Sequence, residues 1–344
     1  MSLSPITVFI VESAAIARKT LTDVLSADPT ISVIGTASNG VIALEHIPQL
    51  QPDVVCTNLQ MPEMNGQELI RQLLAVSPRP VLVVSQTVQP TETQTINQVL
   101  QAGAVDVLSP PKTEQWSAGE RRALLEKIKV LAGVKVLTRP LEPSVPGVSP
   151  PPSNQHCSHL QALAIGASTG GPRAIHQILS RLPSDFPLPI FCTQHISAGF
   201  LPGLISWQDA MCSLHVKAAV AGEVPVPGTV YFAPDHYHLT LDARGRCYYS
   251  TAPAVQRHCP SITVMFDSLA QYYGAGVLGV LLTGMGQDGS AGLQRIAEAG
   301  GLTIAQDETS SVVFGMPKVA IDLGAAAQVL PVDHIAPYIL EYLS

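Results

Sequence analysis

The chain has 344 residues, 46% hydrophobic and only 13% charged, so it is long enough for two ordinary cores and too apolar to be largely disordered. Its formal net charge of −7, without a long lysine- or arginine-rich stripe, argues against nucleic acid as a partner. Apolar runs are short and the N-terminus lacks a basic stretch followed by a long apolar core, so we expect neither a membrane span nor a secretion signal.

Residues 1–131 alternate apolar strand-like runs with amphipathic stretches. The runs ITVFIV, ISVIGT, DVVCT and PVLVV are typical of buried strands, and five strand–helix repeats predict a doubly wound parallel sheet. Short right-handed connections gather the loops that follow the strands along one edge, where such sheets keep their sites. The polar and special residues expected at that edge are Glu12, Ser13, Asn58, Ser85 and Pro110.

Residues 132–158 differ in composition from what precedes and follows them. The stretch TRPLEPSVPGVSPPPSNQ holds six prolines, which remove backbone donors and restrict φ, so neither helix nor sheet can propagate. We therefore expect a semi-extended linker. The alternative, a loop inside one large domain, is disfavoured because long loops without internal structure are uncommon in compact domains.

Residues 159–344 begin a second α/β series. Strands are expected in LQALAIGAS, PLPIFCTQH, TVYFAP, AGVLGVLLTGMG and LTIAQ, with helices near 262–273 and from Ala291. The segment YHLTLDARGRCYYS is typical of a hairpin. The prediction is a second doubly wound domain, mostly parallel, with an antiparallel excursion.

A G-x-S-x-G turn centred on Ser168 follows the apolar strand ALAI and precedes a helix that Pro172 is suited to open. Such a turn exposes the serine hydroxyl and aims backbone N–H groups at a developing oxyanion. The same turn could instead cradle a nucleotide phosphate. Nucleotide-binding folds, however, place an acidic residue at the end of the next strand, and here that strand runs into His195.

Asp288 follows a third buried strand and therefore projects from the same sheet edge as Ser168 and His195. A serine attacks an ester at neutral pH only when a base accepts its proton, and a carboxylate orients that base. Considered one at a time, His195 is more simply explained as a hydrogen-bonded histidine at a strand end, and Asp288 is more simply explained as a turn or helix-capping residue. Together with the serine they predict a serine hydrolase. The chain order Ser, His, Asp disfavours the α/β-hydrolase fold.

Beyond these three residues, longer motifs carry a resemblance. IGASTGGP, TQH, PGTVYFAPDHYHL, LLTGMGQDGSAGL and IAQDETSSVVFGMP resemble, in order and spacing, the protein-glutamate methylesterases of bacterial chemotaxis, the CheB family, over residues 160–335. VFIVESA, NLQMPEMNG and GAVDVLSPP resemble the receiver domain that precedes the esterase in that family. The resemblance implies a flavodoxin-like receiver followed by a Rossmann-like methylesterase domain.

The resemblance also implies an activity: hydrolysis of γ-glutamyl methyl esters on chemoreceptors, giving glutamate and methanol, with deamidation of receptor glutamines in some members. Ser168 corresponds to the nucleophile, His195 to the base and Asp288 to its orienting partner. Thr169 corresponds to a residue that positions the histidine, and Met285 to one that contributes to the oxyanion pocket. No cofactor or metal is implied.

The implied partners are the cytoplasmic domains of methylated chemoreceptors, with the chemotaxis histidine kinase as a further partner of the receiver-like half. The six cysteines are scattered without a C-x-x-C pair, so we expect reduced thiols, no zinc site and a cytoplasmic location. One departure concerns substrate recognition. Where the family has a stretch resembling R-P-S-V-D, this chain has Cys259-Pro260-Ser261-Ile262-Thr263, and both charges are gone.

The receiver-like half departs further from its family. The position that accepts phosphate holds Asn58, whose amide lacks the carboxylate oxygen that would attack phosphorus. The acidic pair that binds Mg²⁺ is reduced to Glu12 and Ser13, the lysine position holds Pro110, and only Ser85 matches. We therefore expect a pseudo-receiver that keeps the fold without phosphoryl chemistry.

Two other functions stay open at this point. A non-catalytic adaptor could use the esterase fold only to bind receptors, although a binding protein has no need for an ordered serine, histidine and aspartate. A hydrolase acting on a different ester is the other possibility.

Overall fold

The computed structural model describes residues 4–85, 99, 102–111, 115–134 and 159–344. The chain divides into two compact units, residues 1–143 and 144–344, which confirms the two predicted domains. Most of the predicted linker, residues 135–158, lies outside the described residues, so its extended conformation and its boundaries stay predictions.

The first unit is a five-stranded sheet in the order β2-β1-β3-β4-β5, and all four strand pairings are parallel. This is the flavodoxin-like order, as predicted. Its strands are β1 (Ile6–Val11), β2 (Ile31–Ala37), β3 (Val54–Thr57), β4 (Val81–Val84) and β5 (Asp106–Leu108). Its described helices include α1 (Ala15–Ser26), α2 (Gly40–Leu50), α3 (Gly66–Val76) and α5 (Ala118–Leu131).

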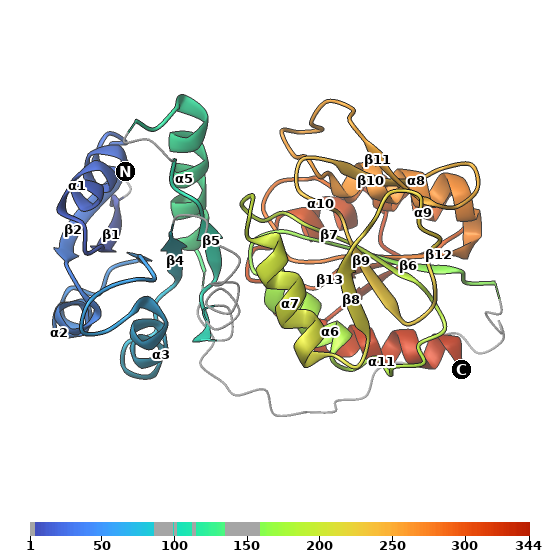
Figure 1. Cartoon of the computed structure of the whole chain (residues 1–344), viewed down its shortest axis with the longest axis horizontal. Coiled ribbons are helices and arrows are strands. Elements are labelled where there is room, and N and C mark those ends of the chain that lie inside the picture. Colours follow the sequence, from blue (N-terminus) through green and yellow to red (C-terminus); the bar gives the residue numbers. More distant parts are fainter. Residues whose placement is uncertain (1–3, 86–98, 100–101, 112–114, 135–158) are drawn as a thin grey trace. The chain divides into compact units, whose positions relative to one another are not determined.

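Helices cover both faces of this sheet, with α1 and α5 on one face and α2 and α3 on the other (Figure 1). Strands β3 and β4 are buried along their whole length, which explains why they read as continuous apolar runs rather than as alternating patterns. Leu25 of α1 and Ile128 of α5 share one buried cluster with Val8 and Ile10 of β1. These contacts fix the strand ends at which the receiver-like residues lie.

The second unit is built on a seven-stranded, fully parallel sheet in the order β14-β13-β12-β6-β7-β9-β8. The predicted hairpin is present, and it forms a separate two-stranded antiparallel sheet. The strands are β6 (Ala162–Ala167), β7 (Ile190–Gln194), β8 (His215–Ala218), β9 (Thr229–Phe232), β10 (His238–Leu241), β11 (Cys247–Ser250), β12 (Val277–Leu281), β13 (Leu302–Gln306) and β14 (Gln328–Leu330).

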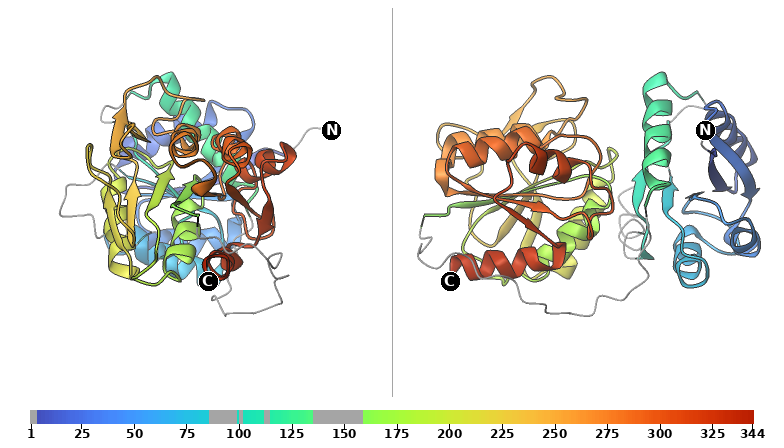
Figure 2. Two further views of the ribbon diagram at one scale, coloured as in Figure 1. Left: turned by 90° about the vertical axis from the view of Figure 1, so that its right-hand side faces the viewer. Right: turned by 180° about the vertical axis from the view of Figure 1, so that it is seen from behind.

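Helices α6, α7 and α11 pack on one face of the large sheet, and α8, α9 and α10 pack on the other (Figures 1 and 2). Their bounds are α6 (Gly171–Leu179), α7 (Leu201–Met211), α8 (Ile262–Tyr273), α9 (Ser290–Glu298), α10 (Met316–Asp322) and α11 (Val332–Leu343); a short 3₁₀ helix, η2 (Gly274–Gly276), follows α8. Among the helices of the described residues, none combines the length and the hydropathy that a membrane-spanning segment requires.

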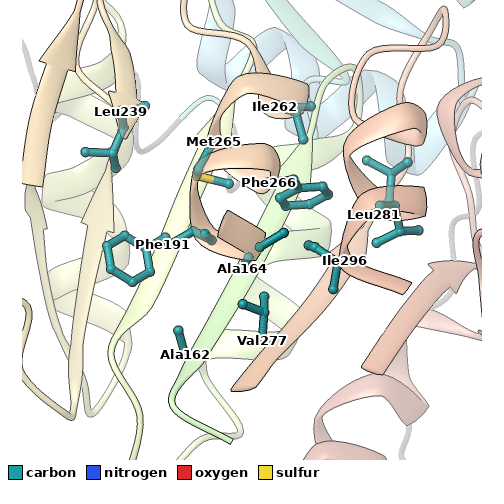
Figure 3. Close-up of a cluster of buried hydrophobic side chains, with 14 of the residues drawn as sticks. Ala162, Ala164, Phe191, Leu239, Ile262, Met265, Phe266, Val277, Leu281 and Ile296 are labelled. Atoms are coloured by element: carbon teal, nitrogen blue, oxygen red, sulfur yellow. The ribbon is translucent and has the colours of Figure 1, made fainter. Parts of the chain in front are cut away.

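Helix α8 lies close to the central strands. Figure 3 shows Phe266 and Ile262 of α8 above Ala164 of β6, with Phe191 of β7 and Leu281 of β12 in the same buried cluster. The helix lies very close to the backbone at Gly166, where an added Cβ would lie 2.2 Å from a methyl carbon of Ile262. The first glycine of the G-x-S-x-G turn is therefore needed for packing against α8.

The order of the strands determines where a site can form. Strand β6 lies between β7, which follows it in the chain, and β12, which comes much later. The connections after β6 and β12 therefore leave the sheet in different directions, which is the arrangement that opens a crevice at the carboxyl ends of parallel strands. Ser168, His195 and Asp288 follow these three neighbouring strands.

Candidate active site

Ser168 occupies the turn between β6 and α6. Its N–H donates to the Thr283 carbonyl at 3.0 Å, and its own carbonyl accepts from the Gly171 N–H at 2.8 Å. Gly170, the residue before α6, has a φ of +78°, a left-handed conformation that favours glycine. The turn therefore holds the serine between the segments that follow β7 and β12.

His195 directly follows β7, and its N–H donates to the Ala167 carbonyl at 2.9 Å, beside the serine. Its Nε2 lies 2.9 Å from Oδ2 of Asp288, and its side chain is only 9% exposed. The imidazole stacks on the ring of His258, with centroids 3.9 Å apart and planes 8° from parallel. The ring is thus held both at its edge and on one face.

Asp288 lies in the loop between β12 and α9, and its side chain is fully buried. Besides His195, four groups donate to its two oxygens: the Ser261 hydroxyl at 2.8 Å and the N–H groups of Ile262 (2.8 Å), Thr263 (3.1 Å) and Gly289 (3.0 Å). Ile262 and Thr263 are the first residues of α8. The carboxylate therefore sits at a helix N-terminus, which favours negative charge.

These contacts determine the charge of the carboxyl group. Burial by itself raises the pKa of Asp288, but the hydrogen bond and charge of His195, together with the bonds from Ile262 and Ser261, outweigh it. The pKa consequently lies well below its ordinary value of 3.8. Asp288 is therefore ionised at neutral pH and can only accept hydrogen bonds.

An acceptor-only Asp288 fixes the tautomer of His195. Nε2 must carry the ring proton that it donates to the carboxylate, so Nδ1 carries the lone pair. Nδ1 is buried and forms no hydrogen bond with any described residue. The structure therefore joins His195 to Asp288 but does not form the hydrogen bond from the Ser168 hydroxyl to Nδ1, a contact that commonly tightens only when substrate binds.

Gln194, which sequence reasoning passed over, connects the serine and histidine segments. Its buried side-chain amide donates to the carbonyl of Ser168 at 2.8 Å and to that of His195 at 2.7 Å. An added Cβ at Gly171 would lie 2.1 Å from Gln194 Oε1, so the glycine leaves room for the amide. The sequence signal that could have found it is a glutamine at the end of IFCTQ, a strand that is buried along its whole length.

Of the two predicted support residues, Thr169 is buried and its carbonyl accepts from the Thr283 hydroxyl at 3.0 Å. Met285 lies in the turn after β12 with 41% of its surface exposed. Their roles beside the histidine and the oxyanion stay predictions. The N–H of Ser168 already donates to the Thr283 carbonyl, so other hydrogen-bond donors have to stabilise an oxyanion.

The two positions where the family's charges are missing differ in environment. Thr263 is buried, and its hydroxyl accepts from the Gly289 N–H at 2.8 Å, so it supports the turn that carries Asp288. Cys259 is a half-buried free thiol whose pKa is raised by burial. Thr263 is uncharged, so, unlike the aspartate that the family has at this position, it places no second negative charge beside Asp288.

In the first unit, Asn58 and Glu12 bind each other. The Asn58 side-chain nitrogen donates to Glu12 Oε2 at 2.9 Å, and its oxygen accepts from the Leu59 N–H at 2.6 Å. The second Glu12 oxygen accepts from the Ala14 N–H at 2.9 Å. Both oxygens of the Glu12 carboxylate thus accept hydrogen bonds from amide N–H groups, one from the backbone and one from Asn58.

The remaining receiver-like residues lie at the same edge. Ser13 donates to the Gln60 carbonyl at 3.4 Å, Ser85 is buried directly after β4, and Pro110 follows β5. Across the parts of the chain that the structure describes, no three histidine, cysteine, aspartate or glutamate side chains are grouped so as to hold a metal ion.

Comparisons with known proteins match both units. The CheB methylesterase family matches residues 163–339, and the response regulator receiver domain family matches residues 8–116. The catalytic domain of the CheB methylesterase of Thermotoga maritima has 38% sequence identity and a TM-score of 0.52, covering 53% of this chain and 98% of that domain.

Full-length relatives cover both halves together. A protein-glutamate methylesterase/protein-glutamine glutaminase of Myxococcus xanthus is 40% identical over 342 residues, covering 98% of this chain and 96% of the relative. One of the same description from Syntrophus aciditrophicus is 37% identical over 342 residues, covering 98% of each. The chain therefore belongs to the CheB family of methylesterases, in which a receiver domain precedes the catalytic domain.

Proposed function

We propose that this chain is a protein-glutamate methylesterase that removes methyl esters from glutamate side chains of chemoreceptors, releasing methanol. The observation that carries the mechanism is the 2.9 Å contact between His195 Nε2 and the buried carboxylate of Asp288, at the sheet edge that also carries Ser168. The family and its full-length relatives support the reaction and its place in chemotaxis adaptation.

The proposed mechanism starts at the Ser168 hydroxyl. Its oxygen attacks the ester carbonyl while Nδ1 of His195 accepts the proton, which leaves an imidazolium held by Asp288. Collapse of the tetrahedral intermediate breaks the bond to the methoxy group, which takes the proton from Nδ1 and leaves as methanol. Water, activated by the same nitrogen, then hydrolyses the acyl-enzyme to glutamate and free serine.

The same acyl-enzyme can form from a glutamine side chain, with ammonia leaving in place of methanol. Deamidation of receptor glutamines is therefore proposed as a second activity, supported by the double name of the relatives. The cytoplasm is the proposed compartment, because the proposed substrates are the cytoplasmic domains of chemoreceptors. The chemotaxis histidine kinase is a further proposed partner of the receiver-like half.

Methanol release from a methylated receptor domain tests the proposal. We expect Ser168→Ala to lower kcat by at least about 10³-fold, because loss of one member of such a catalytic unit removes most of its function. A Ser168→Ala variant as active as the wild type would rule out the serine mechanism. If the wild type binds the receptor domain but releases neither methanol nor ammonia, the adaptor alternative is correct.

We also propose that the receiver-like domain is a pseudo-receiver. Its Asn58 amide donates to Glu12 in the position where the family has a phosphate-accepting aspartate, and Pro110 stands where the family has a lysine. Control of the esterase then does not depend on phosphorylation: either the esterase is constitutively active, or a bound protein or ligand regulates it. Incubation with acetyl phosphate and Mg²⁺ should leave the intact mass unchanged, and an adduct of one phosphoryl group would refute this proposal.

A further inference from the structure

Outside the three proposed catalytic residues, the catalytic unit contains a fully buried histidine, His238, at the start of β10. Its Nδ1 lies 3.0 Å from the backbone nitrogen of Ser261, and its Nε2 lies 3.2 Å from the Ala252 carbonyl. A backbone N–H can only donate, so Nδ1 must carry the lone pair and Nε2 the proton. Both ring nitrogens are therefore engaged, one of them with the residue that precedes α8.

Ser261 is itself fully buried and is the N-cap of α8. Its hydroxyl donates to Asp288 Oδ1 at 2.8 Å and accepts from the Val264 N–H at 3.4 Å. One side chain thus closes the first turn of α8 and binds the carboxylate that contacts His195. A hydrogen-bonded path runs from His238 through Ser261 to Asp288, and it comes from the hairpin rather than from the large sheet.

The hairpin is anchored to α8 at more than this one point. Leu239 of β10 and Ile262 of α8 belong to the same buried cluster, on either side of Met265 in Figure 3. The Leu241 N–H donates to the Ser268 hydroxyl at 2.8 Å, further along α8. The hairpin can therefore fix the position of the helix start on which Asp288 depends.

We infer that Ser261 and His238 are positioning residues for the hydrolysis, which hold Asp288, and through it His195, in the orientation needed for proton transfer. Neither is placed to react with substrate: Ser261 acts through Asp288, and His238 acts through Ser261. The inference rests on the proposed function. The hairpin then affects the rate of hydrolysis, because a shift of the start of α8 would move Asp288, which orients His195.

Ser261→Ala tests the first step. It removes a donor to Asp288 and the cap of α8, and we expect kcat to fall roughly 10–100-fold with little change in KM, a typical effect of a supporting contact. The matched control is Ser117→Ala, because Ser117 caps α5 in the first unit by the same type of bond to a backbone N–H. That control should lose helix capping as well but keep the wild-type kcat.

His238 is tested with a pair of isosteric amides. The oxygen of His238→Asn can take the place of Nδ1 as acceptor for Ser261, whereas His238→Gln can only reproduce Nε2, facing Ala252. We expect kcat of the Gln variant to fall about tenfold and that of the Asn variant to stay within about threefold of wild type. The downfield proton resonance of the His195–Asp288 hydrogen bond should shift in the Gln variant only.

The outcomes separate this inference from the proposed function. If Ser168→Ala is inactive while Ser261→Ala and His238→Gln keep the wild-type kcat and an unshifted resonance, the positioning role is wrong and the hydrolase stands. If Ser168→Ala is active, the proposed function itself fails. Should Ser261→Ala not fold, Ser261→Thr, which keeps the hydroxyl, and Ser261→Gly, which retains most of the capping, provide the comparison; equal kcat values would overturn the role.

Discussion

Asp288 Oδ2 contacts Nε2 of His195 at 2.9 Å, which leaves Nδ1 as the nitrogen with a free lone pair. The carboxylate is ionised because the first turn of α8 and the histidine both stabilise its charge against the cost of burial. The start of α8 therefore sets the orientation of His195. Because the carboxylate binds Nε2, Nδ1 is the nitrogen that remains available to the serine.

Replacing Asp288 by asparagine should remove most of the activity without removing side-chain volume. An amide would hold His195 in the wrong tautomer and could not stabilise the imidazolium, so we expect kcat to fall about 10⁴-fold. Methanol release under single-turnover conditions measures this. An Asp288→Asn variant within tenfold of wild type would show that the carboxylate does not orient the base.

The lowered pKa of Asp288 predicts a dependence of stability on pH. Because the folded-state pKa is below the ordinary 3.8, the ionised carboxylate stabilises the folded catalytic unit above that pH, and the contribution is lost as pH falls below it. The difference in free energy of unfolding between wild type and Asp288→Asn, measured with urea, should therefore become smaller as pH is lowered from about 5 through about 3. A difference that stays constant over this range would contradict the shift.

His258, which stacks on His195, should support activity through its flat ring. We expect His258→Ala to lower kcat about threefold to tenfold, since an aromatic pair contributes about 0.5–1.5 kcal/mol beyond its buried area. His258→Phe keeps a planar ring and should retain most of the activity. Equal losses in both variants would mean that the stacking at 3.9 Å is not what His258 contributes.

In the first unit, Asn58→Asp should reverse the local electrostatics. A second carboxylate would face Glu12 in place of the amide that now donates to it at 2.9 Å, and we expect a loss of about 1–3 kcal/mol in unfolding free energy without divalent cations. Millimolar Mg²⁺ should recover part of that loss in the variant and leave the wild type unchanged. Wild-type stabilisation by Mg²⁺ of the same size would contradict the pseudo-receiver proposal.

The sequence predicted the fold and the location of the candidate site because both follow from local patterns. Ser168, His195 and Asp288 each end or follow an apolar run, and parallel strands bring such positions to one edge. The contact of Gln194 with two carbonyls depends on how two loops meet, which no periodicity records. Ser261 belongs to the stretch that we singled out only because two charges are missing from it. A serine directly before an apolar helical run is nevertheless a recognisable N-cap signal.

Contacts made by the hairpin and the start of α8 were the hardest to anticipate. His238 lies far in the chain from Ser261, which it contacts, and His258 lies far from His195, on which it stacks, so only the folded structure shows these contacts. In the first unit, the loss of the phosphate acceptor at Asn58 was predicted from the resemblance to the receiver family together with the residue type at that position, and it stays a proposal. That the amide then donates to Glu12 required the geometry of two strand ends.

The serine mechanism is tested most directly by a matched measurement of methanol release from a methylated receptor cytoplasmic domain by wild type and by Ser168→Ala. We expect stoichiometric release by the wild type and a rate at least about 10³-fold lower for the variant, with receptor binding retained. Comparable release by the two proteins would contradict the role of Ser168 as nucleophile.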